Sequence, residues 1–362
     1  MQSVSAQIRR SPNNTGKLAL IEMCRGLAAC SVALYHAARH LNAEGGAPRL
    51  MSVWQFGHAG VDLFFVISGF VITYVHLDDI GRPDRLGHYA GRRFQRVFPL
   101  YWIATIVTLA MDVAGSLGWP TPLKALISVM LFPFGDEPIV GVAWTLQFEM
   151  LFYLAFGLSI FNRRLGLAAG LLWLLAILAQ MTTGGLATTL HLLVSPYCLQ
   201  FLAGVLVAIW VRRAPQSVPG FVLPVGICLM LLAMLAEDIG AMNGYANIAR
   251  LYYGLTSALI VLGAAMVSQR REIRPGKLLM ALGSASYSIY LFQFIFIGVV
   301  WQIWQRLPFV RGWSELAPFA VLSLSAIVGG VVVSRTCEYP LLRWIRQQAG
   351  RARPVAAGDK QI

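Results

Sequence analysis

Charged residues are scarce in this chain. They make up 12% of its 362 residues, whereas 57% are Ala, Val, Ile, Leu, Met, Phe, Trp, Tyr or Cys. Soluble globular chains carry about 25% charged residues, which cover their water-facing surface. The low charge and the mean hydropathy of +0.64 therefore exclude a soluble enzyme, a disordered protein and a fibrous repeat, and they indicate a polytopic membrane protein.

Cysteine and acidic residues are also few. No Cys-x-x-Cys pair occurs, and the five Cys residues lie in or beside apolar segments. We therefore interpret them as small packing residues and expect neither disulfides nor a metal site. Because 29 Lys and Arg residues face only 16 Asp and Glu residues, the net charge is +13. In a membrane protein this excess is typical of basic loops that contact anionic lipid, so we expect no nucleic acid partner.

Apolar segments with the length of a membrane span recur along the whole chain. At roughly 20 residues per spanning helix, they predict an all-α fold with about ten transmembrane helices. The expected spans are residues 18–39, 57–76, 97–117, 141–161, 165–182, 190–211, 219–236, 250–268, 283–304 and 316–337. A further apolar run at 123–132 is too short to cross easily, and we expect it to be re-entrant or interfacial.

Lys and Arg residues are concentrated in every second segment between these spans. If the N-terminus is cytoplasmic, the inner segments carry 21 Lys and Arg residues and the outer segments carry six. This asymmetry predicts that both termini are cytoplasmic. The expected organisation is a cytoplasmic segment at 1–17, a membrane-embedded domain at 18–345 and a basic, disordered cytoplasmic tail at 346–362.

Ionisable side chains within the expected spans are candidate functional residues, because each is costly to bury in lipid. The candidates are Glu22, Arg25, His36, Asp62, Asp112, Glu149, His191, Arg335 and Glu338. His191 lies close to Pro196, and we interpret it as structural. Glu338, followed by Arg343, is typical of a salt bridge at the end of a helix.

Arg25 and His36 form the most informative pair. They are 11 positions apart, which is within about 20° of three full helical turns and roughly 16 Å along the axis. One helix face would therefore carry a cation for an anionic ligand and, deeper in the membrane, a base that titrates near neutral pH. The alternative is that Arg25 reaches back to the interface and that His36 is a packed, neutral histidine.

Three further patterns contain candidate site residues. Arg93 and Arg96 would share a helix face and could clamp a phosphate, or they could simply flank a span on its cytoplasmic side. His58 and Asp62 are four residues apart, so the carboxylate could orient an imidazole, or the pair could mark the start of a helix. Glu149 is the only carboxylate in its span, which predicts a cationic or imidazole partner.

Taken together and in chain order, these motifs resemble those of the acyltransferase 3 family of integral membrane O-acyltransferases. The resemblance covers about residues 18–345. Its elements are Arg-x10-His at 25–36, Gly-Val-Asp-Leu-Phe-Phe-Val-Ile-Ser-Gly-Phe at 60–70, Arg-x-x-Arg at 93–96, Trp-Thr-Leu-x-x-Glu at 144–149, Leu-Gly-x-x-Ser-Tyr-x-x-Tyr-Leu at 282–291 and Glu-x-Pro at 338–340. The short chain, without a fused periplasmic domain, is similar to the members that acetylate exopolysaccharides, O-antigens and nodulation factors.

The resemblance implies that the protein is a membrane O-acetyltransferase. It would move an acyl group, expected to be acetyl, from acyl-CoA to a hydroxyl group. That hydroxyl would belong to a cell-surface or exported glycan or to its lipid-linked precursor. It further implies a bacterial inner-membrane location and no permanently bound cofactor, with acetyl-CoA as the donor substrate. The expected partners are acyl-CoA, a glycan or lipid-linked oligosaccharide, membrane lipid and proteins of polysaccharide assembly.

The same resemblance suggests roles for the motif residues. His36 would be the base that takes the proton of the acceptor hydroxyl, or it would carry the acyl group transiently. Either Glu149 or Asp62 would orient its ring. Many relatives carry a second His where this chain has Gln293, so more weight falls on His36.

The donor would be held by arginines. Arg25, Arg93 and Arg96 are expected to bind the phosphates of coenzyme A from the cytoplasmic side. The main alternative is a transporter or flippase for lipid-linked sugars, which would use the same intramembrane charges as a translocation path. A non-catalytic scaffold in polysaccharide assembly is a third hypothesis.

Overall fold

The computed structural model describes residues 18–45, 47–115, 118–133, 137–183, 192–213, 219–270, 275–308 and 313–351. Within these ranges the regular elements are helices. The first half contains α1 (Ala19–Gly45), α2 (Pro48–Trp54), α3 (Gly60–His76), α4 (Leu86–Ala114), α5 (Pro122–Met130), α6 (Trp144–Phe161) and α7 (Arg163–Thr183). The second half contains α8 (Tyr197–Arg213), α9 (Val222–Asp238), α10 (Asn247–Arg270), α11 (Lys277–Ser284), α12 (Ser286–Arg306), α13 (Leu316–Val333) and α14 (Tyr339–Arg351).

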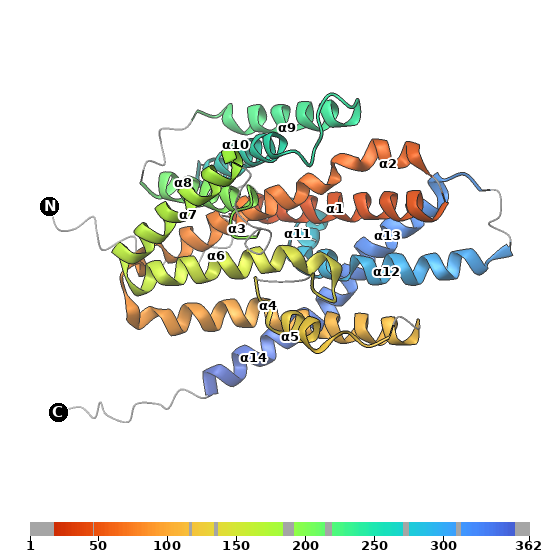
Figure 1. The fold of residues 1–362 in the computed structure, drawn as a ribbon, viewed down its shortest axis with the longest axis horizontal. Coiled ribbons are helices and arrows are strands. Elements are labelled where there is room, and N and C mark those ends of the chain that lie inside the picture. Colours follow the sequence, from red (N-terminus) through yellow and green to blue (C-terminus); the bar gives the residue numbers. More distant parts are fainter. Residues whose placement is uncertain are drawn as a thin grey trace.

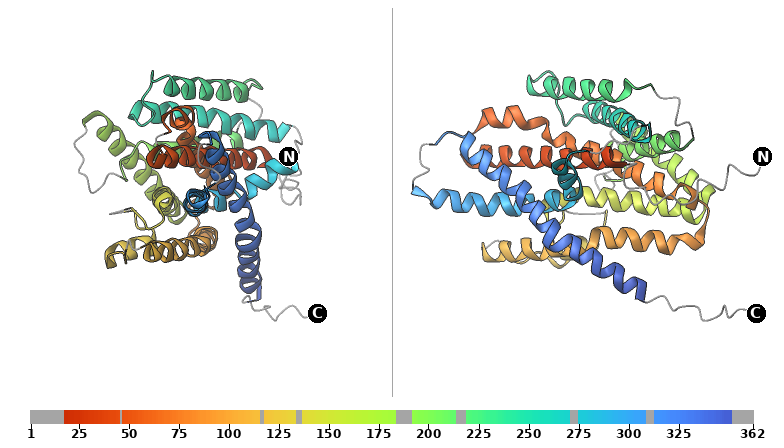
Figure 2. Two further views of the ribbon diagram at one scale, coloured as in Figure 1. Left: turned by 90° about the vertical axis from the view of Figure 1, so that its right-hand side faces the viewer. Right: turned by 180° about the vertical axis from the view of Figure 1, so that it is seen from behind.

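Helix α1 lies at the centre of the bundle. It packs against α3 and α10 on one side and against α11, α12 and α13 on the other (Figure 1). Helix α13 crosses this layer obliquely, and α9 lies at the edge of the molecule (Figure 2). A helix that carries several ionisable side chains is thus enclosed by more apolar helices, which removes its polar groups from lipid.

Seven helical stretches are long and apolar enough to cross a membrane within the described ranges. They are Pro48–Asp79, Pro83–Ala114, Gly141–Phe161, Arg163–Thr182, Asn247–Arg270, Ser286–Arg306 and Leu316–Gln348. The protein is therefore an all-α polytopic membrane protein. The other three expected spans correspond to α1, whose polar side chains lower its hydropathy, and to α8 and α9, which have 17 residues each.

The short apolar run at 123–132 forms a helix too short to span a bilayer. Helix α5 has nine residues, begins after the cap Thr121 and ends at Leu131, whose φ of 52° is left-handed. It is attached to α4, because Tyr101 donates to the carbonyl of Ser128 at 2.7 Å and Trp102 to that of Val129 at 2.9 Å. Helix α4 itself begins at Leu86, so the basic segment before the expected span is already helical.

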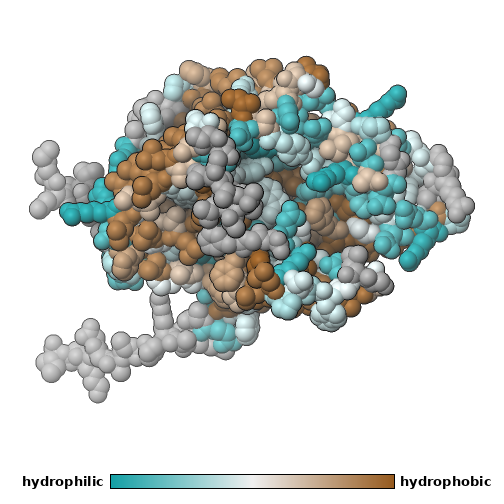
Figure 3. Space-filling view, in the orientation of Figure 1, coloured by the Kyte–Doolittle hydropathy of each residue, from teal (hydrophilic) through white to brown (hydrophobic). Residues whose placement is uncertain are grey.

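The outer surface is apolar where lipid would surround it. Figure 3 shows a broad apolar area on the visible face, with hydrophilic residues toward the ends of the long axis. Only 11% of the apolar stretch of α7 is buried inside the protein. Leu167 and Leu172 of that helix are more than 60% exposed. Exposed leucines in such numbers are costly in water and are suited to hydrocarbon.

Close contacts between glycines bring α1 to the end of α11, three residues before α12 begins. A Cβ atom on Gly26 would lie 2.6 Å from the backbone nitrogen of Gly283, and one on Gly283 would collide with the carbonyl of Glu22. Small residues at helix contacts allow backbones to approach in membrane proteins. This contact places Arg25 next to the first residues of α12, where the candidate site lies.

Candidate active site

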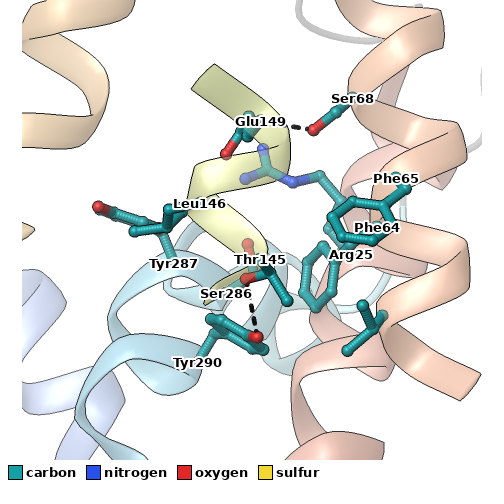
Figure 4. A pocket seen from close by; sticks show the side chains of 11 residues that line it. Arg25, Phe64, Phe65, Ser68, Thr145, Leu146, Glu149, Ser286, Tyr287 and Tyr290 are labelled. Atoms are coloured by element: carbon teal, nitrogen blue, oxygen red, sulfur yellow. Dashed lines mark hydrogen bonds between the residues drawn. The ribbon is translucent and has the colours of Figure 1, made fainter. Parts of the chain in front are cut away.

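A cavity of about 70 Å³ lies where α1, α3, α6 and α12 converge (Figure 4). Arg25 enters it from α1. The other lining residues are Val61, Phe64, Phe65 and Ser68 of α3, Thr145, Leu146 and Glu149 of α6, and Ser286, Tyr287 and Tyr290 of α12. The cavity thus combines an apolar wall with one carboxylate, one guanidinium and several hydroxyls.

Glu149 is held by hydroxyl groups. Ser68 Oγ donates to its Oε1 at 3.1 Å, and Tyr153 Oη donates to the same atom at 2.6 Å. The sequence predicts a cation or an imidazole as partner, whereas the hydrogen bonds that Glu149 accepts come from these hydroxyls. The guanidinium of Arg25 points toward Glu149 in the cavity (Figure 4), but among the described residues no carboxylate forms an ion pair with it. Arg25 therefore keeps donors free for a ligand.

Arg93 packs against Tyr153, the tyrosine that donates a hydrogen bond to Glu149. Its guanidinium carbon is 6.0 Å from the centre of the Tyr89 ring and 5.8 Å from that of Tyr153, whose hydroxyl binds Glu149. Within the described part of the chain, its buried Nε has no hydrogen-bond partner. Arg93 is thus positioned by aromatic rings and retains donors for an anion.

Arg96 lies on the same face of α4, as its spacing from Arg93 predicts, but it is paired. Its Nη1 is 2.5 Å from Oε1 of Glu338, and its guanidinium carbon is 5.1 Å from the ring centre of Tyr287, which lines the cavity. Arg25, Arg93 and Arg96 therefore gather around one end of the cavity. Of Arg93 and Arg96, Arg93 has the freer guanidinium.

Glu338 closes a π-helical turn, Ser334–Glu338, between α13 and α14. Besides Arg96, it accepts hydrogen bonds from Ser288 at 2.6 Å and Ser334 at 3.1 Å. The expected salt bridge with Arg343 at the helix end is therefore wrong, because both carboxylate oxygens are already engaged by α4, α12 and the π turn. Turns of this kind are frequent at functional sites.

His36 lies outside the cavity. Its ring packs edge-on against Phe294 of α12, with 4.5 Å between ring centres. Tyr290, one turn before Phe294, does line the cavity, and its ring meets that of Phe64 at 5.6 Å. On α12 the cavity lining therefore reaches Tyr290, and His36 contacts the next turn of that helix. Arg25 lines the cavity and His36 does not.

The Tyr290 hydroxyl is fixed in this wall. It lies 2.9 Å from Thr145 Oγ1 and 3.0 Å from the carbonyl oxygen of Val142. His36 itself is partly exposed, and Phe294, which it contacts, is 40% exposed.

Asp62 belongs to a separate buried cluster. Its Oδ2 is 2.6 Å from Nη1 of Arg250, and its Oδ1 accepts a hydrogen bond from Gln200. Asp62 is 0% exposed and Arg250 is 3% exposed. Because its oxygens are engaged in this way, Asp62 orients neither His36 nor His58, and that expectation is corrected by the structure.

His58 joins the same cluster through other partners. Its Nε2 is 2.8 Å from Oε1 of Glu237, and its Nδ1 is 3.1 Å from Nη2 of Arg250. Since arginine can only donate, Nδ1 must accept, and the proton must be on Nε2. Tyr253 completes the cluster by donating to Oε2 of Glu237 at 2.5 Å. Glu237 escaped the sequence prediction because the expected span ended one residue before it.

The remaining candidates add little to the site. Gln293 is 0% exposed and donates to the carbonyl of Tyr290, a residue that lines the cavity, at 2.8 Å. The described residues contain no group of His, Cys, Asp and Glu that could hold a metal, and the five cysteines are free. His191 lies outside the described residues.

The sequence profile of the acyltransferase domain family, Acyl_transf_3, matches residues 18–335. The chain belongs to the acyltransferase 3 family. The membership predicted from the motifs is thereby confirmed, and the protein is a membrane acyltransferase. No solved structure matches it significantly.

Curated relatives agree with this membership. The exopolysaccharide production protein ExoZ of Rhizobium meliloti is 31% identical over 324 residues, which cover 84% of this chain and 94% of ExoZ. The acyltransferase MdmB of Streptomyces mycarofaciens is 25% identical over 350 residues, 85% of each chain. Nodulation protein 10 of Rhizobium leguminosarum is 30% identical over 159 residues, 37% of this chain and 41% of that protein.

Proposed function

We propose that the protein transfers a short acyl group, acetyl, from acyl-CoA to a hydroxyl of a cell-surface or exported glycan or of its lipid-linked precursor. The observation that carries the proposal is the cavity in which Arg25 and Glu149 meet an apolar wall, with two further arginines behind it. The similarity to ExoZ, an exopolysaccharide production protein, supports the choice of a glycan as acceptor.

The cavity is suited to the acyl end of the donor. The cavity is small and lined largely by apolar side chains, and the Glu149 carboxylate would repel the phosphates of coenzyme A. The phosphates would instead bind at Arg93, whose donors are free, while Arg96 is held by Glu338. The rings of Phe64 and Tyr290, with 5.6 Å between their centres, line the cavity and would limit the length of the acyl chain.

His36 is our proposed general base. A sugar hydroxyl is a poor nucleophile near neutral pH, and a positioned neutral imidazole can remove its proton as it attacks a thioester. His36 has an edge-on contact with Phe294 and is partly exposed, so the acceptor would reach it from the side opposite the donor. Phe64 and Tyr290 would have to turn aside for the two substrates to meet.

We further propose ten spans with both termini in the cytoplasm of a bacterium, in its inner membrane. The seven stretches of sufficient length and hydropathy would be joined by α1, α8 and α9. The excess of Lys and Arg in the inner segments of this arrangement supports the orientation. It would place Arg93 on the side where acyl-CoA is made.

The experiment that tests the function uses purified protein in lipid nanodiscs with acetyl-CoA labelled in its acetyl group and candidate glycans. Acyl transfer predicts release of the coenzyme A thiol and label in an ester of the glycan. A transporter or flippase predicts neither, and would instead move lipid-linked sugar across vesicles without consuming the thioester. Glycan movement without thioester consumption would overturn the proposal.

A further inference from the structure

Ser286 carries an unpartnered hydroxyl in the wall of the cavity. It is 0% exposed and lines the cavity beside Thr145 and Tyr287 (Figure 4). In the part of the chain that the structure describes, its Oγ has no hydrogen-bond partner. Burying an unsatisfied hydroxyl typically costs about 1–3 kcal/mol. A ligand atom that accepts a hydrogen bond would remove this cost.

The surroundings define the chemistry of that ligand. Val61, Phe65 and Leu146 give it an apolar wall, and the Glu149 carboxylate disfavours an anion. A small, neutral group with a carbonyl oxygen and an apolar substituent fits both conditions. The acyl thioester end of the donor has this chemistry.

The position of Ser286 on its helix suits a carbonyl that becomes negatively charged. It is the first residue of α12, a helix of 21 residues. The N-terminal end of a helix carries partial positive charge and stabilises a nearby anion. A hydroxyl donor at this point would therefore bind an oxyanion more strongly than a neutral carbonyl, which is the property that accelerates acyl transfer.

We propose that Ser286 is a further catalytic residue, which donates a hydrogen bond to the carbonyl oxygen of the acyl thioester. The inference rests on the proposed acyl transfer. The acceptor oxygen forms a bond to the carbonyl carbon, and the π electrons move to the carbonyl oxygen, where Ser286 Oγ–H stabilises them without giving up its proton. When the oxyanion collapses, the carbon–sulfur bond breaks. The proton taken from the acceptor then passes to the thiolate, which leaves as the coenzyme A thiol.

The test compares Ser286→Ala with Ser284→Ala in nanodiscs. Ser284 is two residues earlier, exposed, and donates only to the carbonyl of Ala281 within its own helix, so it is a matched control. The readouts are kcat and KM for acetyl-CoA per folded protein, together with the apparent Tm. We expect kcat of Ser286→Ala to fall by about 100-fold, as for removal of an oxyanion donor. KM and the activity of Ser284→Ala should stay close to the wild type.

Stability separates a catalytic from a structural role. Because the Ser286 hydroxyl has no partner among the residues that the structure describes, its removal should leave Tm unchanged or slightly raised. An unchanged kcat for Ser286→Ala, or a lowered Tm with unchanged kcat per folded molecule, would overturn the inference while the wild-type enzyme still transfers acetyl. If the wild-type protein transfers no acetyl to any glycan, the proposed function itself fails.

Discussion

Arg250 and Asp62 form an ion pair inside the protein, with 2.6 Å between Nη1 and Oδ2 and at most 3% of either residue exposed. Asp62 belongs to the most recognisable motif of the chain, and the sequence alone made it a candidate for orienting the catalytic histidine. The structure assigns its charge to a different task. It ties α3 to α10 and, through Gln200, to α8.

This pairing predicts that Asp62→Asn acts on stability. Removing one partner of a buried ion pair leaves an uncompensated charge and costs about 3–5 kcal/mol. We expect a clearly lowered Tm in detergent, and a double variant Asp62→Leu/Arg250→Met that recovers part of the loss. The molecules that remain folded should transfer acyl groups at nearly the wild-type rate. A variant with wild-type Tm and no transfer would contradict this and return Asp62 to the chemistry.

Arg93 should act on donor binding. Its guanidinium is positioned by Tyr89 and Tyr153 and has donors to spare, whereas its neighbour Arg92 is exposed. Hydrogen bonds to charged groups contribute about 1.5–3 kcal/mol, so Arg93→Ala should raise KM for acetyl-CoA by roughly 10- to 100-fold. Arg92→Ala is the control and should change KM by less than about threefold. Equal effects of the two substitutions would mean that both merely flank the membrane.

Phe64 should limit the acyl chain. Its ring and that of Tyr290 line the cavity and contact each other, so Phe64→Leu should enlarge the cavity and admit a longer chain. Each methylene in such a pocket contributes about 1–3 kcal/mol to discrimination. We expect kcat/KM for butyryl-CoA, relative to acetyl-CoA, to rise by about tenfold.

The control for this substitution is Phe70→Leu. Phe70 is on the same helix, is 0% exposed and stacks on Tyr74 away from the cavity. Phe70→Leu should leave kcat/KM for butyryl-CoA relative to acetyl-CoA unchanged, while lowering the stability by a similar amount. If Phe64→Leu also leaves that ratio unchanged, the cavity does not hold the acyl chain.

The sequence predicted the helical fold and several members of the site for definite physical reasons. Arg25 and Glu149 were singled out because charges are costly inside a span, and that cost is why both are found in one protected cavity. The helical spacing of Arg93 and Arg96 placed them on one face of α4. These inferences needed only local geometry and the cost of burying charge.

The sequence alone does not show which side chains that are far apart in the chain form ion pairs or hydrogen bonds with one another. Glu338 pairs with Arg96, which is 242 positions earlier, and not with the nearby Arg343. His58 and Asp62 share a helical register but turn to Glu237 and Arg250. Ser286 belongs to the Leu-Gly-x-x-Ser-Tyr motif, but the motif assigned it no role; that role emerged only when its hydroxyl was found in the cavity without a partner among the described residues. Such relationships depend on tertiary packing.

The central claim, that His36 is the base of an acyl transfer, is tested most directly by His36→Ala. The control is His40→Ala, one turn further along α1, where the imidazole packs edge-on against Trp301 with 5.7 Å between ring centres. We expect the transfer of labelled acetyl to glycan by folded, inserted His36→Ala to fall by at least about 100-fold, and that by His40→Ala to stay near the wild type. Near-normal transfer by His36→Ala would contradict the assignment.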